Sequence, residues 1–262
     1  MSSDERQGRI ELEYEERRGA RLAVLTVARP ARLNTLSSAL LEELAARLEA
    51  VAGDEEVRLV TVQGAGDRAF IGGADVYEMA GLDATGARAF IRRLHEVCLR
   101  LRSLPVPVVA CIDGYCLGAG LEVALCCDLR LATSRSTFGV PEVRLGVPTV
   151  IEGALLELYV GAGRTRDLVL TGRSFGAREA LDWGLVDRVA APAELGAARR
   201  DLLEQLLAGA PRAVRLQKEL CRVWEEAPLD HAVAQGIESF TDAYRTDEPQ
   251  RYMRRFLDRR RD

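Results

Sequence analysis

The stretch from Val106 to Pro148, VPVVACIDGYCLGAGLEVALCCDLRLATSRSTFGVPEVRLGVP, decides the fold. An apolar run from Val106 to Cys111 ends at Asp113-Gly114, and a segment rich in glycine then leads into LEVALCCDL. A short apolar run, turn residues and a longer apolar segment follow one another here. This order predicts a strand, a tight turn and the start of a helix.

Gly118 and Gly120 precede the predicted helix and leave the backbone uncluttered where a ligand could approach. The first N–H groups of a helix have no acceptor within the helix, so they attract an anion. In an acyl-transfer or enolate reaction, the anion is the oxygen of a polarised carbonyl, and each fixed donor lowers the barrier by roughly 3 kcal/mol. The same glycines are also typical of close packing around a buried helix, and this interpretation stays open.

Two glutamates flank this segment. Glu122 lies in the first turns of the predicted helix, and Glu142 follows Pro141 in a predicted loop after the strand Leu129 to Thr133. A helical glutamate is usually solvated. Apolar residues surround Glu122 on both sides in the sequence, however, and a buried carboxylate requires partners or a task. If the chain folds back after the strand, both carboxylates face one cavity.

A second segment resembles the first. Arg58 to Gly64 is expected to form a strand, and Ala69 to Val76, AFIGGADV, has the composition of a turn that enters another helix. Two such turns could supply two backbone N–H donors to a single oxygen.

Together these segments resemble the enoyl-CoA hydratase/isomerase family, the crotonases. Three stretches are similar to its signature regions, and shorter ones near the two ends agree in order and spacing. The signature stretches are AFIGGADVYEM (Ala69 to Met79), GYCLGAGLEVALCCDLRLA (Gly114 to Ala132) and FGVPEVRLGVP (Phe138 to Pro148), and the others are ARPARLNTLS (Ala28 to Ser37) and FLDRR (Phe256 to Arg260).

The resemblance implies an α/β fold, a crotonase-like spiral of repeated β-β-α units with a C-terminal helical region. It implies that the amides of Ala74 and Ala119 bind the thioester oxygen of a 2-enoyl-CoA. Glu122 is then the base that acts on a water, and Glu142 the acid that supplies a proton to Cα. The residues implied to bind the substrate are Arg32, Leu33, Gly72, Gly73, Asp75, Val76 and Gly118. Neither a metal nor a separate cofactor is expected, because coenzyme A is part of the substrate.

The chain has 262 residues, 48% of them hydrophobic, which suffices for one large core. We expect residues 1–191 to form the spiral core with the acyl-CoA site, and residues 192–262 to form a helical oligomerisation region. The resemblance implies a homotrimer, often paired into a hexamer. A formal net charge of −4 argues against a nucleic-acid partner, and the arginines from Arg254 to Arg261 are interpreted as a solvated surface.

The composition of the chain argues against several kinds of site and catalytic mechanism. The six cysteines lack a CxxC pair and are expected to be mostly buried free thiols, while His95 and His231 are isolated in helical patterns. Lys218 is the only lysine, and the glycine segments do not match GxGxxG. The N-terminus shows no export signal and no apolar run is long enough to span a membrane, so a cytoplasmic location is expected.

Periodicity predicts the remaining elements. Ile10 to Glu16 and Arg21 to Val27 suggest a hairpin, and Leu36 to Val51 a helix capped by Ser37 or Ser38. Ala84 to Leu104 reads as an amphipathic helix that covers the acyl end of the pocket. Its predicted apolar side comprises Ala89, Ile91, Leu94, Val97, Cys98 and Leu101. Ser174 is predicted to cap a short helix, and the helices predicted after Pro192 span 193–208, 211–225, 229–244 and 249–258.

The segment Pro148 to Leu156, PTVIEGALL, departs from the glycine-rich PGxGGTQR typical of hydratases. It adds Glu152, which is interpreted as a carboxylate at a helix start, with a third active-site acid as the alternative. The altered segment leaves open a double-bond isomerase or another enolate-forming acyl-CoA enzyme. A non-catalytic RNA-binding relative conflicts with the acidic charge, and a glycosidase conflicts with the 5% aromatic content and the two glycine turns.

Overall fold

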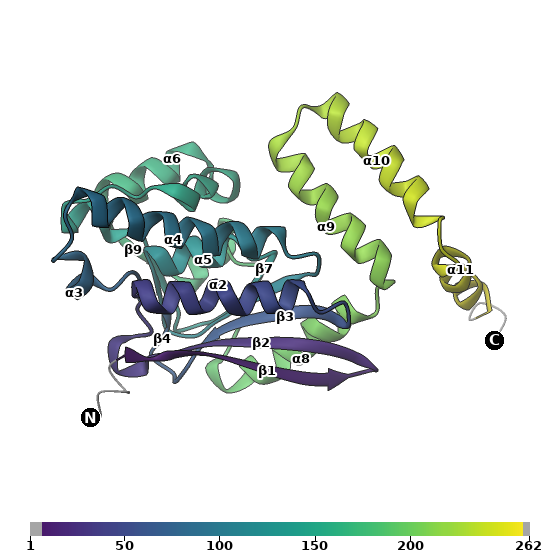
Figure 1. Cartoon of the computed structure of the whole chain (residues 1–262), viewed down its shortest axis with the longest axis horizontal. Helices are drawn as coiled ribbons and strands as arrows, with labels where there is room; N and C mark the ends of the chain where they lie inside the picture. Colours follow the sequence, from purple (N-terminus) through teal and green to yellow (C-terminus); the bar gives the residue numbers. More distant parts are fainter. Residues whose placement is uncertain (1–6, 259–262) are drawn as a thin grey trace.

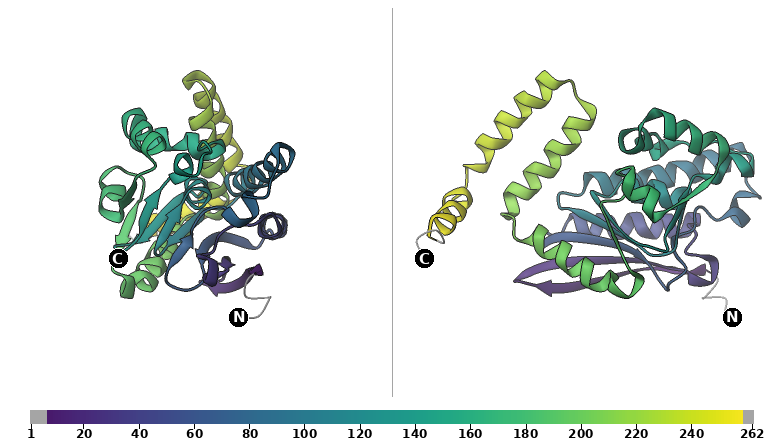
Figure 2. Two further views of the ribbon diagram at one scale, coloured as in Figure 1. Left: turned by 90° about the vertical axis from the view of Figure 1, so that its left-hand side faces the viewer. Right: turned by 180° about the vertical axis from the view of Figure 1, so that it is seen from behind.

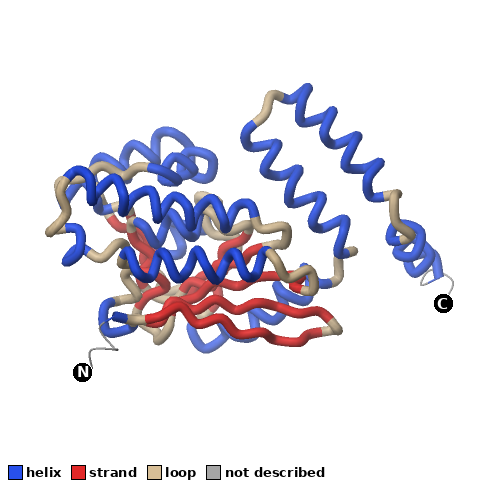
Figure 3. The backbone as a smooth tube through the Cα atoms, in the orientation of Figure 1, coloured by secondary structure: helices blue, strands red, loops and turns tan. Residues whose placement is uncertain are grey.

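The computed structural model describes residues 7–258 and contains two sheets stacked within an α/β core (Figures 1 and 3). The six-stranded sheet has the order β1-β2-β3-β5-β7-β10, in which only the β1–β2 pair is antiparallel. Its strands are β1 (Arg9–Arg17), β2 (Ala20–Ala28), β3 (Val57–Gly64), β5 (Val108–Ile112), β7 (Leu129–Thr133) and β10 (Arg188–Ala190). The predicted hairpin is therefore confirmed.

The four-stranded sheet has the order β4-β6-β8-β9, and its last pair is antiparallel. It comprises β4 (Ala69–Ile71), β6 (Tyr115–Leu117), β8 (Thr137–Gly139) and β9 (Ser174–Gly176). Each turn of the chain adds one strand to the larger sheet and the next strand to the smaller one: β3 then β4, β5 then β6, β7 then β8. This alternation is the predicted spiral of β-β-α units, and it stacks the starts of successive helices at one end of the strands.

Helices cover the sheets and meet around a large apolar core. α2 (Ser38–Ala52) begins at Ser37, whose hydroxyl accepts a hydrogen bond from the Leu40 amide, as predicted. α5 (Ala119–Leu125) is buried along its whole length, because α4 and the sheets surround it. The remaining helices of the core are α3 (Val76–Met79), α4 (Ala84–Ser103), α6 (Leu156–Thr171) and α7 (Ala177–Asp182), with 3-10 turns η1 (Pro30–Arg32), η2 (Pro141–Leu145) and η3 (Ile151–Leu155).

The C-terminal region is helical, as predicted, but its first helix belongs to the core. After η4 (Pro192–Glu194), α8 (Leu195–Leu207) packs against the larger sheet, where Leu202 and Leu203 contact an apolar cluster with Leu59 and Leu131. α9 (Pro211–Glu226), α10 (Leu229–Ala243) and α11 (Glu248–Asp258) then extend away from the core as an arm (Figures 1 and 2). The boundary predicted at residue 192 thus precedes the start of the arm.

Three local predictions were wrong. Ala89 of α4 is exposed and Phe90 is buried instead, because the helix turns its larger apolar side chain toward the core. Ser174 lies in β9, and Gly176 is the N-cap of the following helix. Glu142 does not lie in an open loop: the short strand β8 precedes it, and η2 holds it.

The cysteines agree with the expectation of mostly buried free thiols. Five cysteines are buried free thiols, and Cys221 is exposed. Within residues 7–258, no group of His, Cys, Asp and Glu side chains is arranged to hold a metal ion. None of the helices in that part of the chain combines the length and apolar composition needed to cross a lipid bilayer. Of the predicted basic cluster, Arg254 and Arg255 are exposed, whereas the arginines from 259 on lie outside the described residues.

Candidate active site

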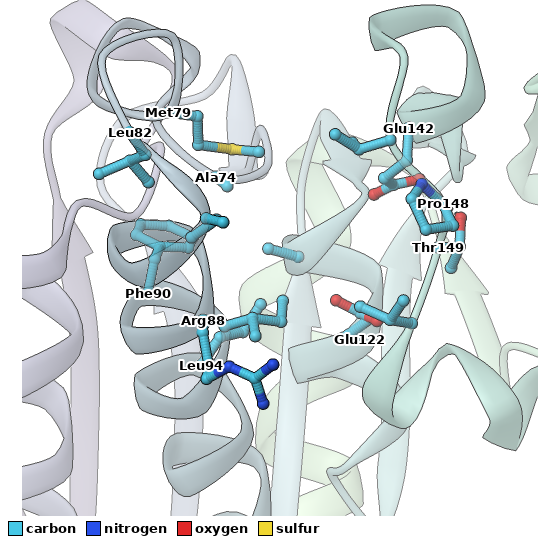
Figure 4. A pocket seen from close by; sticks show the side chains of 16 residues that line it. Ala74, Met79, Leu82, Arg88, Phe90, Leu94, Glu122, Glu142, Pro148 and Thr149 are labelled. Carbon is cyan, nitrogen blue, oxygen red and sulfur yellow. Dashed lines mark hydrogen bonds between the residues drawn. The ribbon is translucent and has the colours of Figure 1, made fainter.

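A cavity of about 540 Å³ opens between α4, the start of α5 and the segment that follows η2 (Figure 4). Most of its lining is apolar, and the two predicted catalytic glutamates are its acidic residues. The lining comprises Ala74, Met79, Leu82, Ala84, Ala87, Arg88, Phe90, Ile91, Leu94, Ala119, Glu122, Glu142, Val147, Pro148, Thr149 and Val150. The volume and apolar walls suit a small acyl chain.

Glu122 reaches the cavity from the first turn of α5 and is only 4% exposed. Its Oε1 accepts a hydrogen bond from the Gly153 amide at 3.1 Å. Gly153 suits this position because an added Cβ would lie 2.5 Å from a methyl carbon of Thr149 and 3.3 Å from Glu122 Oε1. The backbone of the altered segment therefore fixes the carboxylate of Glu122.

Glu142 projects from η2 toward the same cavity (Figure 4). The Thr149 hydroxyl donates a hydrogen bond to its Oε2 at 2.9 Å. Gly118 packs against its other oxygen: a Cβ on Gly118 would lie 2.3 Å from Oε1, and the backbone there has φ +50°. Any side chain at position 118 would displace the carboxylate and strain the turn.

The two glutamates influence each other's ionisation. Burial, followed by the charge of the Glu142 carboxylate, raises the pKa of Glu122 to about 8, against the hydrogen bond from the Gly153 amide, which lowers it. Burial also raises the pKa of Glu142, while its hydrogen bond from Thr149 acts in the opposite direction. Two carboxyl groups in one apolar site share protons. With a pKa of about 8, Glu122 is mostly protonated at neutral pH.

Ala74 and Ala119 line the cavity from the two glycine turns, one after β4 and one after β6. Within residues 7–258, neither of their amides donates a hydrogen bond to another group of the chain. One neighbouring amide of each alanine is occupied: Asp75 donates to the Leu36 carbonyl and Gly118 to the Gly139 carbonyl. The two free donors beside the glutamates are the arrangement expected for an oxyanion hole.

Comparison with known proteins agrees with this geometry. The family model described as Enoyl-CoA hydratase/isomerase matches residues 17–262. The chain belongs to the enoyl-CoA hydratase/isomerase family. It is 35% identical over 242 residues to a short-chain-enoyl-CoA hydratase of Clostridium acetobutylicum, covering 92% of this chain and 93% of the relative. It is also 34% identical over 253 residues to a crotonyl-CoA hydratase of Syntrophomonas wolfei, covering 96% of both chains.

A solved enoyl-CoA hydratase from Bacillus anthracis has the same crotonase fold. The TM-score is 0.91 at 29% sequence identity, and the match covers 95% of this chain and 96% of the other. The resemblance read from the signature segments is therefore confirmed at the level of both family and fold.

The residues predicted to bind the substrate do not line the cavity. Arg32 stacks on the ring of Tyr77, with its guanidinium carbon 4.2 Å from the ring centroid. Leu33 has a left-handed backbone, and its carbonyl accepts a hydrogen bond from the Gly72 amide at 2.8 Å. Gly73 continues that turn, and its carbonyl accepts a bond from Leu36. These contacts join the segment around Arg32 to the first glycine turn.

Asp75 and Val76 follow the turn without entering the cavity. The buried carboxylate of Asp75 forms an ion pair with Arg29 at 2.6 Å and accepts a hydrogen bond from the Tyr77 amide. Val76 is half-exposed at the start of α3. The structure therefore gives Asp75 a role in the conformation of the Ala74 turn, while its contribution to substrate binding stays a prediction.

Sequence reasoning missed the residues that hold the glutamates. Thr149 and Gly153 lie in the segment that departs from the family pattern, and this departure was the only signal available. Glu152 lies in the first turn of η3, as interpreted, but it is also buried: the residue is 7% exposed, and its Oε1 lies 2.7 Å from Nδ1 of His95. Neither residue could be paired from sequence because α4 and η3 are far apart along the chain.

Proposed function

We propose that this protein is an enoyl-CoA hydratase that adds water across the 2,3 double bond of a 2-enoyl-CoA thioester. The observation that carries the proposal is the convergence of two glutamates and two free amides, those of Ala74 and Ala119, on one apolar cavity. The hydratases of Clostridium acetobutylicum and Syntrophomonas wolfei support it by their similarity over most of the chain.

In this mechanism the thioester oxygen accepts hydrogen bonds from the amides of Ala74 and Ala119, which stabilise the enolate as negative charge develops on it. A water bound between Glu122 and Glu142 attacks C3. Glu122 takes a proton from that water, and Glu142 delivers its proton to Cα as the enolate collapses. One C–O bond and one C–H bond form while the double bond is lost, and the product is a 3-hydroxyacyl-CoA.

The charges of the substrate-free site fit this cycle. When the product forms, Glu122 carries the proton that it took from water and Glu142 is ionised. This is the state that the raised pKa of Glu122 favours at rest. A new water that bridges the carboxyls can pass the proton from Glu122 to Glu142 and prepare the next turnover. The pair thus needs no proton donor outside the site.

The proposal is tested with crotonyl-CoA and purified protein. Hydration removes the absorbance of the conjugated enoyl thioester, whereas isomerisation of a 3-enoyl-CoA would increase it. Glu122→Gln and Glu142→Gln should each lower kcat by roughly 100-fold or more with little change in the binding of a saturated acyl-CoA. Wild-type protein that hydrates no ester in a series of graded chain lengths, or two variants with near-normal rates, would refute the proposal.

We also propose that the chain forms a homotrimer, which can pair into a hexamer, through its C-terminal arm. α10 exposes an apolar stripe of Leu229, Val233, Ile237 and Phe240, and α11 exposes Met253, Phe256 and Leu257. Such a continuous apolar face is typical of a subunit interface. Sedimentation equilibrium measures the mass, and a monomer at micromolar concentration would refute this assembly.

We propose a cytoplasmic location, because the free thiols of the chain suit a reducing compartment, and cell fractionation can test it.

A further inference from the structure

A third buried glutamate, Glu152, lies close enough to Glu122 for its charge to act on it. Glu152 lies in η3, next to Gly153, whose amide donates to Glu122. Its side chain is 8% exposed, and one oxygen is 2.7 Å from Nδ1 of His95 on α4. Its other oxygen, Oε2, is buried and has no hydrogen-bond partner in the described part of the chain. A buried carboxylate oxygen in this state is costly and calls for a functional explanation.

The charge of Glu152 acts on Glu122. The Glu152 carboxylate adds to burial and to the Glu142 charge in raising the pKa of Glu122. Cys98 on α4 also lies close to Glu152, and it is a buried thiol whose pKa is raised, so it supplies no positive charge. His95 is therefore the one group seen to contact the carboxylate within residues 7–258, and its ring is half-exposed.

We propose that Glu152 is a positioning residue that strengthens Glu122 as the base of the hydration, and that His95 orients the Glu152 side chain through its contact with the carboxylate. This inference rests on the proposed hydratase function. A negative charge in an apolar site favours the protonated form of a neighbouring carboxyl group. It therefore strengthens the attraction of Glu122 for the proton of the attacking water. The contact between Nδ1 of His95 and Oε1, at 2.7 Å, fixes the orientation of the Glu152 side chain.

The test replaces Glu152 by glutamine, which keeps the shape and removes the charge. The pH dependence of kcat/KM reports the ionisation of the substrate-free glutamate pair. Glu152→Gln should shift the high-pH limb of that profile to lower pH by about one pH unit. It should also lower the plateau kcat roughly threefold and leave KM unchanged, because Glu152 does not line the cavity. The matched control is Glu157→Gln on α6, which makes the same change in net charge at an exposed position.

His95→Phe separates the role of the histidine. It should shift the same limb in the same direction by a smaller amount, and the double variant should match Glu152→Gln alone because His95 acts through Glu152. Shifts that add in the double variant would overturn the role given to His95. A Glu152→Gln profile that superimposes on that of the wild type would overturn the proposal as a whole.

A titration without substrate distinguishes this inference from the proposed function. Infrared difference spectra of the resting protein follow the protonated carboxyl band of Glu122, which is assigned by its loss in Glu122→Gln. In Glu152→Gln the band should disappear at lower pH than in the wild type. An unmoved band refutes the positioning role even if the hydratase is active, whereas a shifted band without any hydratase activity refutes only the proposed reaction. Circular dichroism confirms that each variant is folded.

Discussion

The strongest prediction concerns the stability of Glu122→Gln, because the active site places an acid where an ionised group is unfavourable. Burial and the neighbouring carboxylates raise the pKa of Glu122 from 4.5 to about 8. Between these values the folded protein holds a proton that the unfolded chain has released, so folding stability decreases as the pH rises. At about 1.4 kcal/mol per pH unit, the full effect over roughly 3.5 units is ~5 kcal/mol. The loss is complete once the pH exceeds 8.

Glutamine removes this dependence and keeps an oxygen that accepts the Gly153 amide. The free energy of unfolding of Glu122→Gln minus that of the wild type should therefore increase from pH 5 to pH 8 and then level off. Urea unfolding at fixed protein concentration measures this difference, and fixed concentration keeps any contribution of assembly constant. Glu157→Gln, at an exposed position, should show no such increase. A difference that stays flat, or declines, between pH 5 and pH 8 would contradict the electrostatics assigned to the site.

Three further substitutions test single contacts. Thr149→Val removes the hydrogen bond to Glu142 and should lower kcat/KM by roughly tenfold. The loss should be larger at pH 6 than at pH 8, because the low-pH limb of the kcat/KM profile moves to higher pH. An equal loss at both pH values would contradict this. Gly118→Ala should lower kcat at least about 100-fold, since its Cβ would lie 2.3 Å from Glu142, whereas Gly163→Ala, with no atom within 4 Å, should be neutral. Phe90→Ala enlarges the acyl cavity and should therefore favour longer acyl chains. The kcat/KM for an eight-carbon enoyl-CoA, divided by that for a four-carbon enoyl-CoA, should rise by roughly tenfold. An unchanged ratio would exclude Phe90 from chain-length selection.

The hydrogen bonds that orient the glutamates come from the segment that departs most from the usual hydratase pattern. Thr149 donates a hydrogen bond to Glu142 and Gly153 donates one to Glu122, so this segment orients both carboxylates despite its unusual sequence. This geometry favours hydration over the isomerase alternative, since both acids are held at the cavity. Glu152, introduced by the same segment, adds a third buried carboxylate whose charge acts on Glu122.

The sequence by itself determined most strands of the larger sheet, the glycine turns and the two glutamates that face the cavity. Buried strands and helix starts leave local signals: the apolar run of β5, the glycines at 118 and 120, and the cap of α2 all depend on neighbouring residues. The signature segments then predicted the family, because their order and spacing reflect a fixed spiral. The spiral places each turn beside the next, so the meeting of Ala74 with Ala119 could be anticipated.

Only the tertiary structure decided what surrounds each catalytic group. The hydroxyl of Thr149, the amide of Gly153 and the contact between His95 and Glu152 join elements whose relative positions depend on packing. The raised pKa of Glu122 likewise results from burial and from charges brought together by folding. These interactions act through space over a few ångströms, and no periodicity along the chain records them.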